Sequence, residues 1–185
     1  MTKDILHPKV EHKITELVTP EFYEDWKLNV YKLAKALKIE LFEAIFDDDA
    51  ISGYISKTTD QDNFEIVVNK RHSNSRKRFT VAHEIGHYIS YIAWSYSKDF
   101  LSWNDDVITD SLVAFRSKDI PDDKKNMELE ANEIAAELLM PKVRIEVMVM
   151  KNFSIADMAM VFEVSKEAMS VRLARLYPYH FWFLF

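Results

Sequence analysis

Glycine is nearly absent from this 185-residue chain, in which Gly53 and Gly86 are the only two, and cysteine does not occur at all. So few glycines exclude a glycine-rich loop that would cradle phosphates. The lack of cysteine excludes a disulfide scaffold, a thiolate metal site and a cysteine nucleophile, so a bound metal needs His, Asp or Glu ligands. Hydrophobic residues make up 48% of the chain, enough for a sizeable core in one domain, with or without a small appendage.

The charge distribution argues against a nucleic-acid or membrane protein. A net charge of −6 disfavours non-specific attraction to nucleic acid or to anionic lipid. No apolar stretch is long enough to cross a bilayer, and residues 1–8 lack the apolar region of a signal peptide. We therefore expect a cytoplasmic protein without membrane attachment.

The spacing of apolar residues divides the chain into helices and short strands, which predicts an α+β fold. Helical spacing is found at residues 21–38, 75–94, 127–139 and 141–150, and strand-like patterns are found at 50–56, 63–69 and 107–115. Residues 154–176 look like two short helices joined by a turn. We predict one domain over residues 1–150, including an N-terminal helix, and a C-terminal helical subdomain with an apolar tail over 151–185.

The sequence His83-Glu-Ile-Gly-His87 matches the pattern H-E-x-x-H. On a helix, residues four apart lie on the same face, so both imidazoles can reach one metal ion, and Glu84 is placed to act as general base on water at the metal. The alternative is an exposed helix with two unrelated histidines. A helical wheel at about 100° per residue favours the metal site, because it separates His83, Glu84 and His87 from an apolar stripe on the opposite side.

Gly86 lies between the two histidines, although glycine inside a helix costs about 1 kcal/mol relative to alanine. Its presence in a chain with so few glycines predicts either tight helix packing or the close approach of another segment beside the metal.

A catalytic zinc site needs a third protein ligand, and the segment Met127–Pro141 offers four glutamates. The wheel groups Glu130, Glu133 and Glu137 as a solvated face and puts Glu128 on another side, in line with Asn132 and an alanine. We therefore predict Glu128 as the third ligand, and Asn132 as the hydrogen-bonding partner that orients a ligand. The alternative is that all four glutamates are surface charges.

The segments Arg78–Tyr88, Glu128–Pro141 and Phe162–Leu173 resemble the ImmA/IrrE family of metallopeptidases, within a similarity that spans Ile51–Leu176. The resemblance implies a gluzincin-like core, in which the zinc-site helices pack on a short β-sheet. It implies Zn²⁺ held by His83, His87 and Glu128, with Glu84 as base. It also implies a cytoplasmic protein of a bacterium or mobile genetic element that acts in transcription regulation, by cleaving a helix-turn-helix repressor or an antitoxin-like partner.

Two features of the substrate site are predicted less directly. Tyr88, Tyr91 and His72 are candidates for stabilising the oxyanion, and the strand Phe64–Val68 can pair with an extended substrate by strand addition.

The alternative function is a non-catalytic, zinc-containing regulatory module that binds and sequesters a repressor. Glu84 favours the enzyme, because a purely structural zinc site has no need of a base.

The C-terminal segment has a helix-turn-helix cadence, with Ser165 as the expected cap of its second helix. Its basic residues Lys166, Arg172 and Arg175 are offset by acidic neighbours, so we expect packing or contact with a partner repressor rather than DNA binding. The tail Phe181–Phe185 is aromatic and predicts either an interface or a segment that folds back onto the domain.

Overall fold

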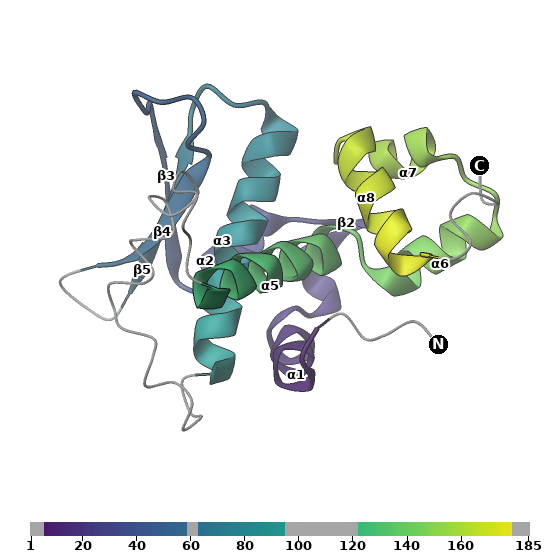
Figure 1. The fold of residues 1–185 in the computed structure, drawn as a ribbon, viewed down its shortest axis with the longest axis horizontal. Helices are drawn as coiled ribbons and strands as arrows, with labels where there is room; N and C mark the ends of the chain where they lie inside the picture. The colour runs from purple at the N-terminus through teal and green to yellow at the C-terminus, as the bar shows by residue number, and fades with distance from the viewer. Residues whose placement is uncertain (1–5, 59–62, 95–121, 179–185) are drawn as a thin grey trace.

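The computed structural model describes residues 6–58, 63–94 and 122–178 (Figure 1). In chain order its elements are α1 (Pro8–Leu17), η1 (Pro20–Phe22), β1 (Tyr23–Glu24), β2 (Lys27–Leu28), α2 (Val30–Ala36), β3 (Ile39–Ala44), β4 (Gly53–Lys57), β5 (Phe64–Asn69), α3 (Asn74–Trp94), α5 (Asp122–Leu139), α6 (Lys142–Met150), α7 (Ile155–Phe162) and α8 (Lys166–Leu176). This mixture of helices and strands confirms the predicted α+β class. None of the helices in the described ranges is long and apolar enough to cross a membrane.

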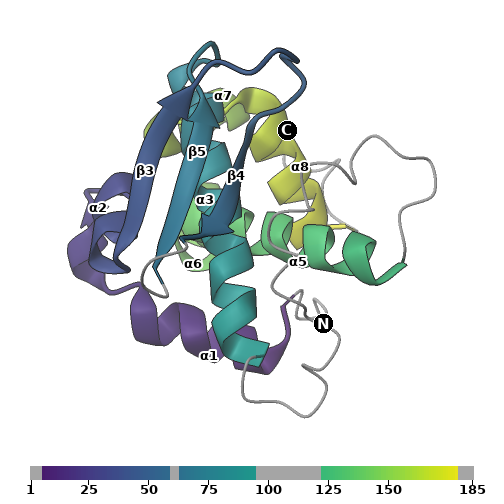
Figure 2. The same ribbon diagram turned by 90° about the vertical axis from the view of Figure 1, so that its left-hand side faces the viewer.

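A three-stranded sheet in the order β3-β5-β4 forms one side of the molecule, with β3 parallel and β4 antiparallel to β5. Its inner face carries the buried side chains Ile55, Ile66 and Val68 and packs against α3, which lies behind the sheet in Figure 2. Because β5 is paired on both edges, the expectation that Phe64–Val68 adds a substrate strand is wrong. Of the strands described here, β3 and β4 have the outer edges.

The predicted strands at 50–56 and 63–69 and the predicted helices from Ser75 onward are confirmed, although α5 begins five residues earlier than expected, at Asp122. The predicted helix at 21–38 is wrong in its first half. Asp25 has a φ of 55°, which reverses the chain between β1 and β2, and the Asn29 side chain accepts a hydrogen bond from the Lys32 N–H where α2 starts. Helix α1 and strand β3 were not predicted, and the expected strand at 107–115 lies outside the described residues.

The C-terminal helices share one hydrophobic core with the rest of the chain. Met158 and Phe162 of α7 and Met169 and Leu173 of α8 are buried in the same cluster as the apolar faces of α3 and α5. The predicted cap Ser165 accepts a hydrogen bond from the Ala168 N–H at 3.0 Å and begins α8. The division into residues 1–150 and 151–185 stays a prediction.

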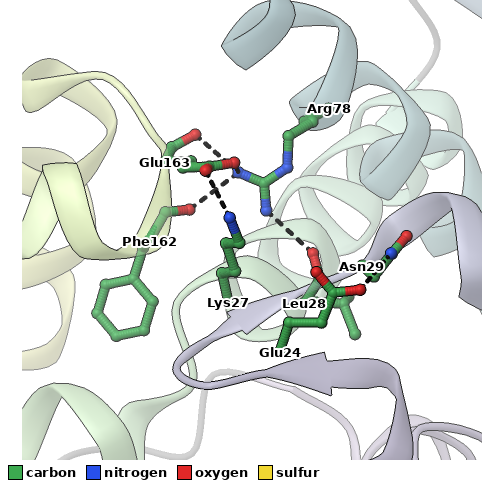
Figure 3. A network of polar contacts seen from close by, with 7 residues as sticks. All are labelled: Glu24, Lys27, Leu28, Asn29, Arg78, Phe162 and Glu163. Carbon is green, nitrogen blue, oxygen red and sulfur yellow. Dashed lines mark hydrogen bonds and ion pairs between the residues drawn. The ribbon is translucent and has the colours of Figure 1, made fainter.

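A buried arginine joins the N-terminal part of α3 to α7 and to the β1–β2 hairpin (Figure 3). The Arg78 guanidinium donates hydrogen bonds to the carbonyls of Phe162 (3.0 Å), Glu163 (2.9 Å) and Leu28 (3.0 Å). The Glu163 carboxylate lies 3.3 Å from Arg78 and 2.7 Å from Lys27. Arg78 therefore fixes the helix that carries His83 against two elements that are distant in sequence.

Candidate metal centre

The three side chains predicted as metal ligands lie together where α3 meets α5. The Nε2 atoms of His83 and His87 are 3.1 Å apart, and the Glu128 carboxylate oxygens lie 3.2 Å from His83 Nε2 and 3.3 Å from His87 Nε2. Their ligand atoms all fall within 4.8 Å of one another. Around a tetrahedral metal ion with bonds of about 2.0–2.1 Å, ligand atoms are separated by about 3.3–3.4 Å. The cluster therefore fits one metal ion.

The two helices meet at Gly86, and this contact brings Glu128 within reach of the histidines. A Cβ atom at Gly86 would lie 2.7 Å from the carbonyl oxygen of Ala131 and 3.2 Å from its Cα. Only a residue without a side chain permits this separation. The close approach of another segment, which Gly86 predicted, is thus the crossing of α5 one turn after Glu128.

The nitrogen of His83 that faces away from the cluster, Nδ1, also has a polar partner. His83 Nδ1 lies 3.1 Å from Asn132 Oδ1, an acceptor, so Nδ1 carries a proton and Nε2 is the nitrogen that faces His87 and Glu128. The Phe79 ring stacks against the His83 ring with 6.5 Å between the centroids. Asn132 therefore lies beside His83 on the helix that also carries Glu128, and its role in orienting a metal ligand stays a prediction.

Glu84 is buried beside the cluster and reaches toward the sheet. Burial is the main reason that the pKa of Glu84 is raised, and the charges of His83 and His87 and a backbone hydrogen bond from Ile55 oppose this shift. Within the described residues, Oε2 of Glu84 has no hydrogen-bond partner. A buried carboxylate with one unsatisfied oxygen and a raised pKa has the properties of a general base.

His83 and Glu128 shift each other's pKa in opposite directions. Burial alone lowers the pKa of His83, but its hydrogen bond with Glu128 and the nearby Glu84 charge outweigh burial, so the pKa is raised. Burial alone raises the pKa of Glu128, but the hydrogen bonds from His83 and His87 hold it at about 2. Glu128 is therefore an anion at neutral pH, the form in which a carboxylate binds a cation.

The expectation of a solvated face at Glu130, Glu133 and Glu137 is wrong. Glu130 accepts hydrogen bonds from Ser90 Oγ (2.7 Å) and Trp94 Nε1 (3.3 Å), which tie α5 to the C-terminal end of α3. Glu133 is buried and forms an ion pair with Arg175, and Glu137 forms one with Arg172. The wheel cannot show that α3 and α8 cover two further sides of α5.

The three candidate oxyanion donors lie in different surroundings. Tyr88 and Tyr91 pack edge-on against Phe64 of β5, with centroids 5.0 and 5.7 Å apart. His72 precedes α3, and its Nε2 lies 3.0 Å from the carbonyl oxygen of Asp49. Their role in oxyanion stabilisation stays a prediction.

Two contacts at the site were missed from the sequence. Phe79 lies one helical turn before His83, so its contact with that ring was accessible from the same spacing that related the histidines. The Ile55 backbone reaches Glu84 from β4, and no pattern in the sequence connects a strand's peptide group to a helix side chain.

Comparison with known proteins agrees with this arrangement of residues. The profile of the peptidase M78 family, described as the IrrE N-terminal-like domain, matches residues 34–90 and 107–174, which is well over half of the chain. A search of curated proteins finds no match. The matched ranges include both histidines, Glu84, Glu128 and the C-terminal helices. The chain therefore belongs to the ImmA/IrrE family of metallopeptidases.

Proposed function

We propose that this protein is a zinc-dependent endopeptidase that cleaves a helix-turn-helix transcriptional repressor or an antitoxin-like partner in the cytoplasm. Family membership supports the metallopeptidase class. The observation that carries the proposal is Glu84, a buried carboxylate beside the candidate ligands with one oxygen that has no partner in the described residues. A metal site that only stabilised the fold would gain nothing from burying this group, because an unpaired buried carboxylate costs free energy.

The donor set supports zinc as the metal. His83, His87 and Glu128 supply two nitrogens and one oxygen, the combination found at catalytic zinc sites of the gluzincin type. When bound, zinc supplies Lewis-acid activation of water and polarisation of the scissile carbonyl.

The protein's own groups would divide the remaining work. Asn132 keeps the His83 ring in the tautomer that leaves Nε2 available as a ligand. The Ile55 backbone N–H would hold the Glu84 carboxylate by a hydrogen bond. The other carboxylate oxygen of Glu84, Oε2, would accept the proton of the attacking water and return it to the leaving amine.

The outer edge of β4 is the place where we propose that an extended substrate binds. The hydrogen bonds from Asn69 N–H to the Ser52 carbonyl and from Thr58 N–H to the Asn63 carbonyl set the register of β4 on β5. In an antiparallel pair the direction of the peptide groups alternates, so those of Gly53 and Ile55 point to the other edge. The Ile55 contact with Glu84 places this edge beside the proposed base.

The pair α7–α8 supports a helix-turn-helix-like segment that packs rather than reads DNA. Glu163 adopts a left-handed conformation at the end of α7, and Ser165 caps α8 after a short turn. Arg172, which a DNA-binding helix would expose, is buried, and its Nε donates a hydrogen bond to the Met140 carbonyl at 3.2 Å. A buried, paired arginine is not available to phosphates or bases.

The proposal is tested with a candidate helix-turn-helix repressor from the same genome. Zinc-loaded wild type is incubated with the purified repressor, and products are identified by intact-mass spectrometry, with Glu84→Gln as the matched variant. We expect a defined cut by the wild type and at least about 100-fold slower cutting by Glu84→Gln at unchanged zinc content. A stable complex with an uncut repressor would instead establish the regulatory module.

A further inference from the structure

A groove of about 500 Å³ lies between the N-terminal part of α3, the second half of α5 and α8. In Figure 1 these parts of α3 and α8 both stand above α5. Its apolar lining comes from all three helices and from the turn before α8: Phe79, Ala136, Met140, Val164, Ala168 and Val171. This volume is within the range of sites that bind small ligands or a few side chains.

The groove shares two lining residues with the surroundings of the candidate ligand His83. Asn132 and Phe79 line the groove, and both also contact the His83 imidazole, by a hydrogen bond and by ring stacking. A group bound in the groove therefore lies one residue layer away from a candidate metal ligand. An extended polypeptide advances about 3.3 Å per residue. If its scissile bond lies at the candidate metal centre, the side chains a few residues away can therefore enter the groove.

The α3 wall and the α8 wall of the groove carry different charges. Arg172 and Arg175 of α8 also line it, but both are paired with glutamates of α5, and the exposed Glu167 puts a carboxylate on the same α8 wall. Arg76 is exposed, and within the part of the chain that the structure describes its guanidinium contacts the Ser52 hydroxyl and forms no ion pair. Ser73 and Ser75 lie at the same end, where α3 begins and its dipole is positive. This wall is complementary to a carboxylate.

We propose that the groove is a substrate subsite, which binds a large apolar side chain of the polypeptide together with a neighbouring acidic residue. The apolar side chain lies between Phe79, Ala168 and Val171, and the carboxylate lies at Arg76. This assignment rests on the proposed peptidase function, since the occupant is the protein substrate itself. It makes Arg76 and Val171 specificity-determining residues.

The test measures peptide binding by methyl NMR on the full zinc-loaded chain carrying Glu84→Gln, so that the probe is not consumed. The probes are two blocked octapeptides with the same leucine pair, flanked by glutamates in one and by lysines in the other. We expect the glutamate peptide to shift the methyl signals of Ala136, Met140 and Ala168 and to bind at least about tenfold more tightly. Binding of both peptides with equal affinity, or without shifts at these methyls, overturns the proposal.

Substitutions at the rim make the test specific. Arg76→Glu is expected to reverse the order of the two peptides, and Val171→Arg to weaken both at least about tenfold. Val171 is 51% exposed, so an arginine there is compatible with folding, and Met160→Arg is the matched control because Met160 is 72% exposed on α7 and does not line the groove. If Val171→Arg binds like Met160→Arg, the subsite is elsewhere.

Two further outcomes separate this inference from the function on which it rests. Repressor cleavage by the wild type without peptide shifts in the groove overturns the subsite alone. Peptide binding in the groove without any cleavage by the zinc-loaded wild type contradicts the endopeptidase and leaves a peptide-binding module. If removal of residues 179–185 by itself shifts the groove methyls and the glutamate peptide binds elsewhere, the tail is the occupant and the substrate assignment is overturned.

Discussion

Single atoms decide how closely the two helices of the candidate metal centre approach each other. At Gly86 the backbone of α3 touches the backbone of α5 at Ala131, and this contact has no room for even a methyl group. Glu128 lies on the same helix just before that point and reaches both histidines. The cost of a glycine inside a helix therefore accompanies a helix crossing that brings the candidate ligand Glu128 to both histidines.

Replacing Gly86 by alanine is expected to lower the free energy of unfolding by about 1–3 kcal/mol, because the methyl group would meet the Ala131 carbonyl. In an unobstructed helix the same change would stabilise the protein by about 1 kcal/mol. Urea unfolding of the metal-free protein measures the sign directly. Zinc affinity, measured by competition with a chelator, should fall as well, because α5 must move away from α3.

Glu128 and Glu130 are separated by one residue but have different surroundings, which makes them a matched pair. We expect about one zinc per chain in the wild type and in Glu130→Ala, and loss of most of it in Glu128→Ala, by elemental analysis after desalting. Glu130→Ala should instead lower the free energy of unfolding by about 1–3 kcal/mol, because Ser90 and Trp94 lose their acceptor. Zinc loss in Glu130→Ala with retention in Glu128→Ala would exclude Glu128 as the ligand.

At the level of elements, two buried arginines attach the C-terminal helices to the two helices of the candidate metal centre. Arg78 of α3 binds the end of α7, and Arg172 of α8 binds Glu137 and the Met140 carbonyl at the end of α5. Both guanidinium groups are buried, so their hydrogen bonds act in a medium of low dielectric constant. The position of α3 relative to α5 therefore depends on α7 and α8.

Arg78→Ala is expected to lower the free energy of unfolding by about 2–4 kcal/mol, because three carbonyls lose their donor together. Arg71→Ala is the control: Arg71 forms an exposed ion pair with Asp49, and its loss should cost less than about 1 kcal/mol. Thermal and urea unfolding of both variants measure the difference. Equal effects would mean that the Arg78 network contributes no more than a surface pair.

The molecule as a whole is organised around one continuous core that begins at Leu6 and extends to Leu176. The sheet covers one side of α3, and α5 with the C-terminal helices covers another (Figures 1 and 2). The candidate metal centre and the groove both lie between these parts, so they require the complete arrangement.

A fragment of residues 1–150 is therefore expected not to fold cooperatively. It would expose the part of the core that Met158, Phe162, Met169 and Leu173 cover in the full chain. Circular dichroism during heating should show a broad transition or none, whereas the full chain should melt sharply. A sharp transition of the fragment at the same temperature would show that residues 151–185 are a separate unit.

Features of this protein that depend on neighbours along the chain follow directly from its sequence. The spacing of His83 and His87 places them on one face of a helix wherever that helix lies, and the helical wheel puts Glu128 and Glu130 on different sides of theirs. Ser165 could be assigned as a cap for the same reason, since its hydrogen bond closes within three residues.

Features that depend on contacts between distant segments follow from the packing of the folded chain. The strand order puts β4 at the edge of the sheet and β5 in its centre. The backbone of Ile55, in β4, forms a hydrogen bond with Glu84. Glu133 changed from a predicted surface charge to a buried ion-pair partner because α8 packs on α5. Local periodicity reports which side of a helix a residue occupies, but which element covers that side is set by the packing of the whole chain.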